Sequence, residues 1–169
     1  LQVGHTYTIT CDVATDVVGN GVDMNTDRGG GVANGTATNL VTNPTMEADS
    51  NWNDTTPAPD GNVRSSFEHS GTWSRAFASD GANQGIISDA YTTVAGKQYL
   101  ATAWVYPDDG TTVTMKLLEG NGSTLHTKNI TGLTENAWNQ VAEQYIDASG
   151  GSGAKIQFDC GASTTGDWY

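Results

Sequence analysis

Two large aromatic side chains, Trp104 and Tyr106, stand on one face of an alternating stretch at residues 93–107. Because successive side chains of a strand point to opposite sides, the two rings share their face with Leu100 and Thr102. The opposite face carries an apolar set expected to line the core, made of Tyr99, Ala101, Ala103 and Val105. Exposed rings beside short polar side chains suit the binding of a sugar ring, and the same surface suits packing beneath a loop. The residues leave both interpretations open.

No arrangement of acids, histidines or cysteines predicts catalysis. The three histidines, His5, His69 and His126, are scattered and lack the order of a catalytic triad or the spacing of a metal-binding motif. Glycoside hydrolysis needs two carboxyl groups that face each other across a cleft at roughly 5–10 Å. The adjacent pair Asp108 and Asp109 instead precedes a glycine in a turn, where acids are usually solvated. We therefore expect a protein that is not an enzyme.

The elements that would position these residues are short β-strands. Of the 169 residues 21 are glycine, and abundant Thr, Asn, Ser and Asp favour strands and turns over helices. We expect strands at residues 65–67, 73–78, 84–87, 93–107, 111–119, 124–130, 138–146 and 154–160. Short strands at near-regular spacing predict an all-β fold, an antiparallel β-sandwich of the jelly-roll type.

The N-terminal residues 1–38 differ from the rest of the chain. Residues 4–13 repeat the alternation of residues 96–105, and a Gly-, Asp- and Asn-rich linker follows. This recurrence indicates either the remnant of a preceding sister module or chance reuse of a common strand pattern. We expect a strand and linker at 1–38 and one β-sandwich at 39–169. The chain begins without Met, so we expect it to be a piece of a longer protein.

Charge and cysteine usage narrow the partners. The formal net charge is −12, and Lys and Arg form no cluster, so no nucleic acid partner is expected. No apolar run approaches the about 20 residues that span a bilayer, which predicts no membrane insertion. Cys11 and Cys160 share the parity of apolar neighbours, and we favour two buried thiols over a disulfide.

Five motifs resemble the carbohydrate-binding modules of families four, nine and twenty-two. They are Asn-Leu-Val-Thr-Asn-Pro-Thr-Met-Glu at 39–47 with Trp52, Gly-Thr-Trp-Ser at 71–74, Val-Ala-Gly-Lys-Gln-Tyr at 94–99 with Trp104, Trp-Asn-Gln-Val at 138–141, and Gly-Asp-Trp-Tyr at 166–169. The resemblance covers residues 39–169. It implies a jelly-roll sandwich, of a kind that occurs in tandem in secreted glycoside hydrolases, cell-surface proteins and phage virions.

The resemblance also implies a binding mode, in which aromatic rings lie against sugar rings and nearby amides and carboxylates bind the hydroxyl groups. The expected carbohydrate-binding residues are Trp104, Tyr106, Trp52, Gln157 and Asp159. In the competing interpretation, the rings of the first two pack beneath a loop such as 49–61. Trp73 and Trp138 match family positions that look structural, so they are left out of the expected site.

The families often hold a structural Ca²⁺, and the resemblance assigns Glu47 to its ligands. The usual partner acid belongs to a closing strand that would follow Tyr169. Met46 stands where the family usually has Phe, a change of shape that cores tolerate.

Two functions fit these expectations. The first is a non-catalytic glycan-binding module of a secreted or particle-surface protein. The alternative is a structural or assembly subunit, such as a phage virion or tail component or a surface-filament subunit, whose aromatic face packs against a neighbouring chain. Solvent over Trp104 and Tyr106 favours the first, and protein over them favours the second. In either case an extracellular, cell-surface or virion location is expected.

Overall fold

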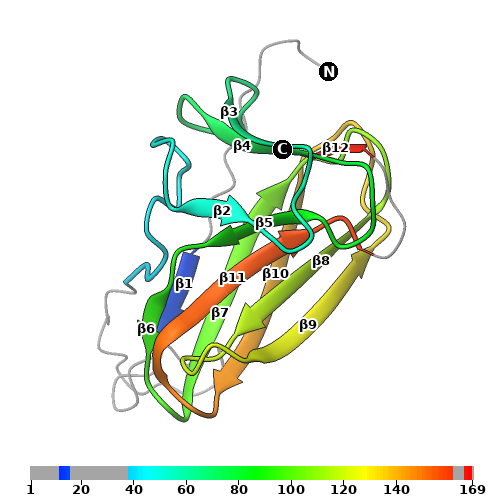
Figure 1. Cartoon of the computed structure of the whole chain (residues 1–169). Helices are drawn as coiled ribbons and strands as arrows, with labels where there is room; N and C mark the ends of the chain where they lie inside the picture. The colour runs from blue at the N-terminus through cyan, green and yellow to red at the C-terminus, as the bar shows by residue number, and fades with distance from the viewer. Residues whose placement is uncertain (1–11, 16–37, 162–165, 169) are drawn as a thin grey trace, which may run out of the picture.

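The computed structural model describes residues 12–15, 38–161 and 166–168, which form twelve β-strands and no helix (Figure 1). One sheet has the order β1 (Asp12–Thr15), β7 (Lys97–Val105), β10 (Asn139–Asp147). A second has the order β2 (Trp52–Asp54), β5 (Gly85–Ser88), β11 (Gly151–Asp159), β8 (Thr112–Leu118), β9 (Thr124–Thr131), and β6 (Tyr91–Thr93) also pairs with β11. A small third sheet has the order β12 (Gly166–Trp168), β4 (Ser74–Ser79), β3 (Gly61–Ser65).

The core lies between the first two sheets, which lie one behind the other in Figure 1. β7 buries every second side chain from Tyr99 to Val105, as its alternation predicts, and β11 does the same with Ala154, Ile156 and Phe158. All strand pairs are antiparallel. The prediction of an all-β antiparallel sandwich is therefore confirmed.

The outward face of the first sheet follows from the register of β7 and β10. Trp104 lies opposite Gln140, and Leu100 lies opposite Gln144. Four outward side chains of β10 are exposed, namely Gln140, Ala142, Gln144 and Ile146. Directly paired residues share a face, so these side chains and those of β7 form one continuous surface that ends at Trp104.

The bounds of several strands differ from those expected. Within residues 93–107, β7 begins at Lys97, because a turn at Gly96, with φ +74°, separates it from β6. β11 begins at Gly151 instead of residue 154. β3 occupies residues 61–65 instead of 65–67. β2 falls in a segment that was expected to be a loop, because Asn53 and Asp54 are exposed and Trp52 alone gives the segment a buried side chain.

Little of the N-terminal prediction can be compared with the structure. β1 pairs with β7, with Asp12 opposite Thr102, so this described piece of residues 1–38 extends the first sheet. The division of the chain at residue 38 stays a prediction.

Cys160 is buried and its Sγ donates to the carbonyl oxygen of Gly81 at 3.2 Å. Cys11 lies outside the described residues, so the preference for buried thiols over a disulfide is untested.

A buried carboxylate organises the end of the sandwich where β7 begins. Asp147 has no exposed surface, and its Oδ2 accepts hydrogen bonds from the Thr93 hydroxyl and from Gly120 N, the latter at 3.0 Å. Its Oδ1 accepts from Ser149 N at 2.9 Å and Gly150 N at 2.8 Å. One side chain thereby ties together the turns before β7, after β8 and after β10.

The two sheets are also joined at one border by an ionic cluster. Glu143 of β10 lies 2.8 Å from Nε2 of His126 and 3.5 Å from Nζ of Lys128, both on β9. His126 therefore lies in a cross-sheet contact.

Within the described part of the chain, no helix is long and apolar enough to cross a membrane.

Candidate functional site

Five rings gather where β7 ends, and we call Phe67, His69, Trp104, Tyr106 and Trp138 the aromatic cluster. His69 lies flat on Trp104, with 4.0 Å between ring centroids and 16° between planes. Phe67 stands edge-on to Tyr106 at 4.7 Å and stacks on Trp138 at 5.8 Å. Trp138 also lies 5.1 Å from Tyr106 and 5.9 Å from His69. Such distances between ring centroids are those of favourable aromatic pairs.

Three segments bring the cluster together. Trp104 is an outward residue of β7 and Tyr106 follows two residues later. Trp138 directly precedes β10, and the register that sets Gln140 opposite Trp104 places it opposite Tyr106. Phe67 and His69 come from the loop between β3 and β4, residues 66–73, which folds over the other rings. The two sheet strands therefore supply a fixed base, and the loop supplies two further rings.

The cluster is a surface feature. Phe67 is 39% exposed, and the other four rings are partly buried. Beyond Trp104 the outward face of β7 and β10 continues with exposed glutamines and ends at Leu100 and Ile146, which are 40% and 59% exposed. The site thus combines the aromatic cluster at one end with a row of polar and apolar side chains along β7 and β10.

Burial also affects the protonation of His69 in the loop. Partial burial lowers the pKa of His69 below its ordinary value of 6.5, because desolvation disfavours the imidazolium. A neutral imidazole therefore stacks on Trp104 at pH 7. No Lys or Arg stands at the outward positions of β7 or β10 or in the aromatic cluster.

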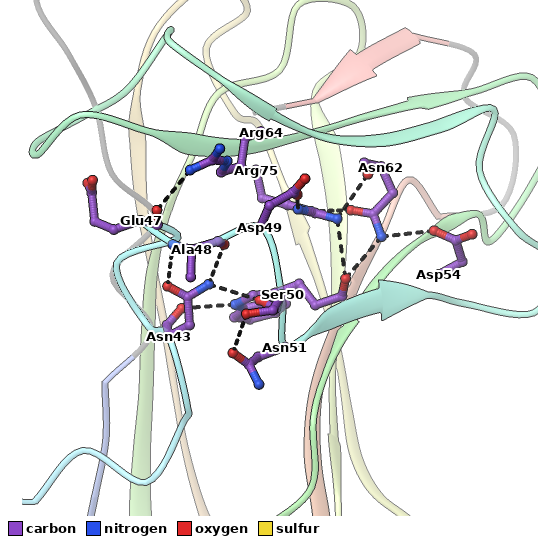
Figure 2. Close-up of polar contacts among 11 residues, drawn as sticks. Asn43, Glu47, Ala48, Asp49, Ser50, Asn51, Asp54, Asn62, Arg64 and Arg75 are labelled. Carbon is purple, nitrogen blue, oxygen red and sulfur yellow. Dashed lines mark hydrogen bonds and ion pairs between the residues drawn. The ribbon is translucent and has the colours of Figure 1, made fainter.

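The loop 66–73 is fastened at its C-terminal side by Glu47. Oε1 of Glu47 accepts hydrogen bonds from Thr72 N at 2.8 Å and Trp73 N at 3.3 Å. Arg64 donates from Nη1 to the Glu47 carbonyl oxygen at 3.1 Å (Figure 2), and its guanidinium lies 4.7 Å from the centroid of the Trp73 ring. These contacts connect residues on both sides of the loop.

Trp52 does not belong to the binding surface, contrary to the expectation. It is 3% exposed, its ring lies 6.4 Å from Phe158 in the core, and its Nε1 donates to the carbonyl oxygen of Asn43. The polar residues around it made the segment look like an exposed loop. The physical reason for the correction is that β2 pairs with β5 and turns this one ring inward.

Gln157 and Asp159 lie on the other side of the molecule from Trp104. They point outward from β11, in the second sheet, whereas Trp104 points outward from the first. Asp159 is moreover fully buried, and its Oδ2 lies 2.7 Å from Nζ of Lys116 and accepts from Gln157 Nε2 at 3.0 Å. The expected grouping of these two residues with Trp104 and Tyr106 is therefore wrong, because parity within a strand does not tell which sheet the strand joins.

The competing interpretation, in which a loop covers Trp104 and Tyr106, is partly met by a different loop. Segment 66–73, and not 49–61, supplies the rings that contact them. The covering rings, Phe67 and His69, and the base ring Trp138 were missed. Trp138 was signalled by the strand pattern, since it precedes β10 on the outward parity, but nothing local marked the loop rings.

Calcium at Glu47 stays a prediction. Ca²⁺ takes six to eight oxygen ligands, and among the described residues no group of three or more His, Cys, Asp or Glu side chains gathers. Oε1 of Glu47 already accepts two N–H groups. The described residues therefore offer one carboxylate, and no acidic cage, for such an ion.

Comparison with known proteins places the fold. No family model and no curated protein matches the sequence. A family 4 carbohydrate-binding module superposes with a TM-score of 0.53 and 14% identity over 70% of this chain and 87% of its own length. The module TmCBM61, solved with β-1,4-galactotriose, gives a TM-score of 0.52 and 17% identity over 73% and 85%.

Part of a phage protein has a similar fold. The enzymatically active domain of tailspike protein 4 of bacteriophage CBA120 gives a TM-score of 0.53 and 16% identity over 73% of this chain and 19% of that one. At such identities the likeness concerns fold alone. The chain has the jelly-roll β-sandwich fold of carbohydrate-binding modules, as its motifs predicted.

Proposed function

We propose that this chain is a non-catalytic module that binds a neutral glycan, in a secreted or particle-surface protein. The glycan would lie on the aromatic cluster and along the outward face of β7 and β10. The observation that carries the proposal is the cluster itself, five partly exposed rings gathered on one surface, of which Trp138 also packs against the core. Aromatic rings gathered on a surface often mark an interaction site, and a sugar presents an apolar face that can lie against such a ring.

The surface beyond the rings has the polar groups that sugar hydroxyls need. Gln140 and Gln144 are exposed and lie opposite Trp104 and Leu100. An amide both donates and accepts hydrogen bonds, which suits a hydroxyl. From Trp104 to Gln98 the strand extends about 20 Å at its usual rise per residue, enough for several sugar rings in a row.

Charge favours an uncharged ligand. The formal net charge of the chain is −12, and no Lys or Arg lies on the proposed surface. A glycan rich in uronic acid or sulfate would meet repulsion without a local cation to offset it. We therefore assign the ligand class as neutral polysaccharide.

The absence of catalysis is part of the proposal. His69 is the histidine of the cluster and stacks on Trp104. Glu68, its neighbour in sequence, is 8% exposed and so does not present its carboxylate to a ligand. Neither residue belongs to a facing pair of carboxyl groups of the kind that glycoside hydrolysis requires.

The variant Trp104→Ala tests the proposal. We expect loss of binding to neutral polysaccharides in affinity electrophoresis and calorimetry, while urea unfolding stays cooperative. Burial of the ring is partial, so the free energy of unfolding should fall by less than the roughly 3–5 kcal/mol of a fully buried Trp→Ala. Val63→Ala, at a side chain 58% exposed on β3, is the control for apolar truncation. Unchanged binding by Trp104→Ala, or a loss of stability in the full range of a buried ring, would contradict the platform.

An assembly role remains the second candidate, because Leu100 and Ile146 are exposed on the same face. Large apolar side chains at neighbouring positions also suit contact with another protein chain. Light scattering after size exclusion separates the two functions. A monomer that binds polysaccharide supports the module, whereas a stable oligomer that buries this face and binds no sugar supports assembly.

A further inference from the structure

We propose that Glu47 is a positioning residue for the aromatic cluster: its carboxylate holds the loop 66–73 so that Phe67 and His69 rest on the rings of the sheet. The part of this inference that concerns glycan affinity rests on the proposed function. The part that concerns the loop rests on the contacts alone.

The carboxylate acts on the end of the loop. Thr72 and Trp73 directly precede β4, and their N–H groups donate to Oε1 of Glu47 at 2.8 and 3.3 Å. Glu47 thus supplies an acceptor, distant in sequence, for two backbone N–H groups that lie outside the strands. The contact of Trp73 N is partly buried and that of Thr72 N is exposed, so the loss of the acceptor costs stability chiefly at Trp73, and the loop is held where the oxygen is.

The start of the loop is held to the same residue. Arg64, the fourth residue of β3, donates to the Glu47 carbonyl oxygen at 3.1 Å and lies over the Trp73 ring at 4.7 Å. Across the loop itself, Ser74 Oγ donates to the Phe67 carbonyl oxygen. Glu47 and Arg64 therefore hold the two ends of the loop together, and we call this pair the Glu47 clamp. Phe67 and His69 lie between these two ends in the sequence.

The position of Glu47 is fixed from the core side. The preceding residue, Met46, is fully buried, has φ +59° and donates from its N–H to the Asn43 carbonyl oxygen at 3.2 Å. The Asn43 side chain binds the next residues as well, donating to the carbonyl oxygens of Ala48 at 2.8 Å and Ser50 at 2.9 Å (Figure 2). A non-glycine residue in the left-handed region persists when its surroundings hold it there. The turn thus gives Glu47 a defined place from which to hold the loop.

The clamp needs an acceptor oxygen, and this requirement distinguishes it from a metal site. Glu47→Gln retains a side-chain oxygen that can accept from Thr72 N and Trp73 N. Glu47→Ala removes the acceptor. A calcium ligand would depend on the negative charge, which both variants lack. The two variants therefore separate positioning by hydrogen bonds from metal binding.

The experiment follows the loop and the ligand separately. The imidazole proton shifts of His69 report stacking on Trp104, because the indole ring current displaces them from the values of a solvated histidine. In Glu47→Ala we expect these shifts to move toward the solvated values and the affinity for neutral polysaccharide to fall by about tenfold, as for the loss of one or two hydrogen bonds. Glu47→Gln should retain the shifts and stay within about twofold of the wild-type affinity.

Two further variants complete the design. Glu119→Ala makes the same charge change at the turn between β8 and β9, at the far end of the sandwich, and should leave both measurements unchanged. Arg64→Ala breaks the exposed half of the clamp and should move the His69 shifts in the same direction as Glu47→Ala. It keeps the proposal testable if Glu47→Ala proves unfolded in urea titrations.

The proposal would be overturned if the His69 shifts did not move in folded Glu47→Ala. It would also be overturned if the Gln and Ala variants behaved alike and the wild-type protein responded to Ca²⁺ or to a chelator. If the wild-type protein binds no polysaccharide but the shifts move in Glu47→Ala and not in Glu47→Gln, the positioning role stands and the glycan function fails.

Discussion

The two ends of β7 differ in the side chains that surround them, which are buried and polar at one end and aromatic and partly exposed at the other. At the Lys97 end, one fully buried carboxylate, that of Asp147, accepts hydrogen bonds from the Thr93 side chain and from backbone N–H groups of two turns. At the Trp104 end, five rings contact one another and stay partly exposed. The first end satisfies its polar groups internally, and the second leaves apolar surface toward solvent.

This difference separates stability from binding within one strand. A buried polar network that is fully satisfied fixes the geometry of the turns around it and offers no free group to a ligand. The turns at that end approach closely, since a Cβ at Gly120 would come within 2.1 Å of the Gly150 carbonyl carbon. At the aromatic end, the Glu47 clamp holds the loop at its two ends. We therefore expect substitutions at the two ends to affect different measurements.

Asp147→Ala should have the largest effect. It leaves the Thr93 hydroxyl and Gly120 N without this acceptor in a buried place, and Ser149 N and Gly150 N without it in partly buried contacts. An unsatisfied buried donor costs about 1–3 kcal/mol, so a loss of unfolding free energy of about 3 kcal/mol or more is expected in urea titrations at pH 7. The folded fraction should retain the His69 shifts and the polysaccharide affinity. A large drop in affinity with unchanged stability would mean that the two ends are not separate.

Acid should weaken the polar end at a lower pH than that at which the aromatic end responds. Burial raises the pKa of Asp147, but the hydrogen bonds from Thr93, Gly150, Gly120 and Ser149 outweigh it and hold the pKa below its ordinary value of 3.8. The unfolded chain then takes up the proton first as pH falls. The stability that this group contributes is fully present above pH 3.8 and is lost as pH falls through the lower folded value. Unfolding free energy should therefore fall more steeply with acid in wild type than in Asp147→Ala.

The sequence was sufficient for the fold and for the outward direction of Trp104. Alternation along 93–107 placed Tyr99, Ala101, Ala103 and Val105 in the core and Trp104 outside, because period two is a local property of the chain. The motifs at 39–47 and 94–99 pointed to the family whose fold the structure shows. Both inferences need only neighbouring residues or their order.

What failed depends on contacts distant in sequence. Gln157 has the predicted outward direction but belongs to the other sheet, and parity carries no information on sheet membership. Trp52 is buried because β2 pairs with β5, which its polar neighbours do not reveal. Phe67 and His69 reach the site through a loop whose path is set by Glu47, some twenty positions before them. These features are decided by tertiary packing.

The smallest expected effect is the response of the aromatic end to mild acid. Partial burial lowers the pKa of His69 in the folded state, so between its ordinary value of 6.5 and the lower folded value the unfolded chain binds more protons. Stability should therefore fall slightly as pH decreases from 6.5, and below the folded value protonated His69 should stack less well on Trp104. His69→Phe keeps a flat ring at this position and cannot take up a proton, so it should remove this component between neutral pH and the acid range in which Asp147 begins to respond. Unfolding free energy and polysaccharide affinity measured from pH 7.5 to 5 test this expectation. If His69→Phe retains the wild-type pH dependence of both, the ring that stacks on Trp104 does not control the mild-acid response of this end.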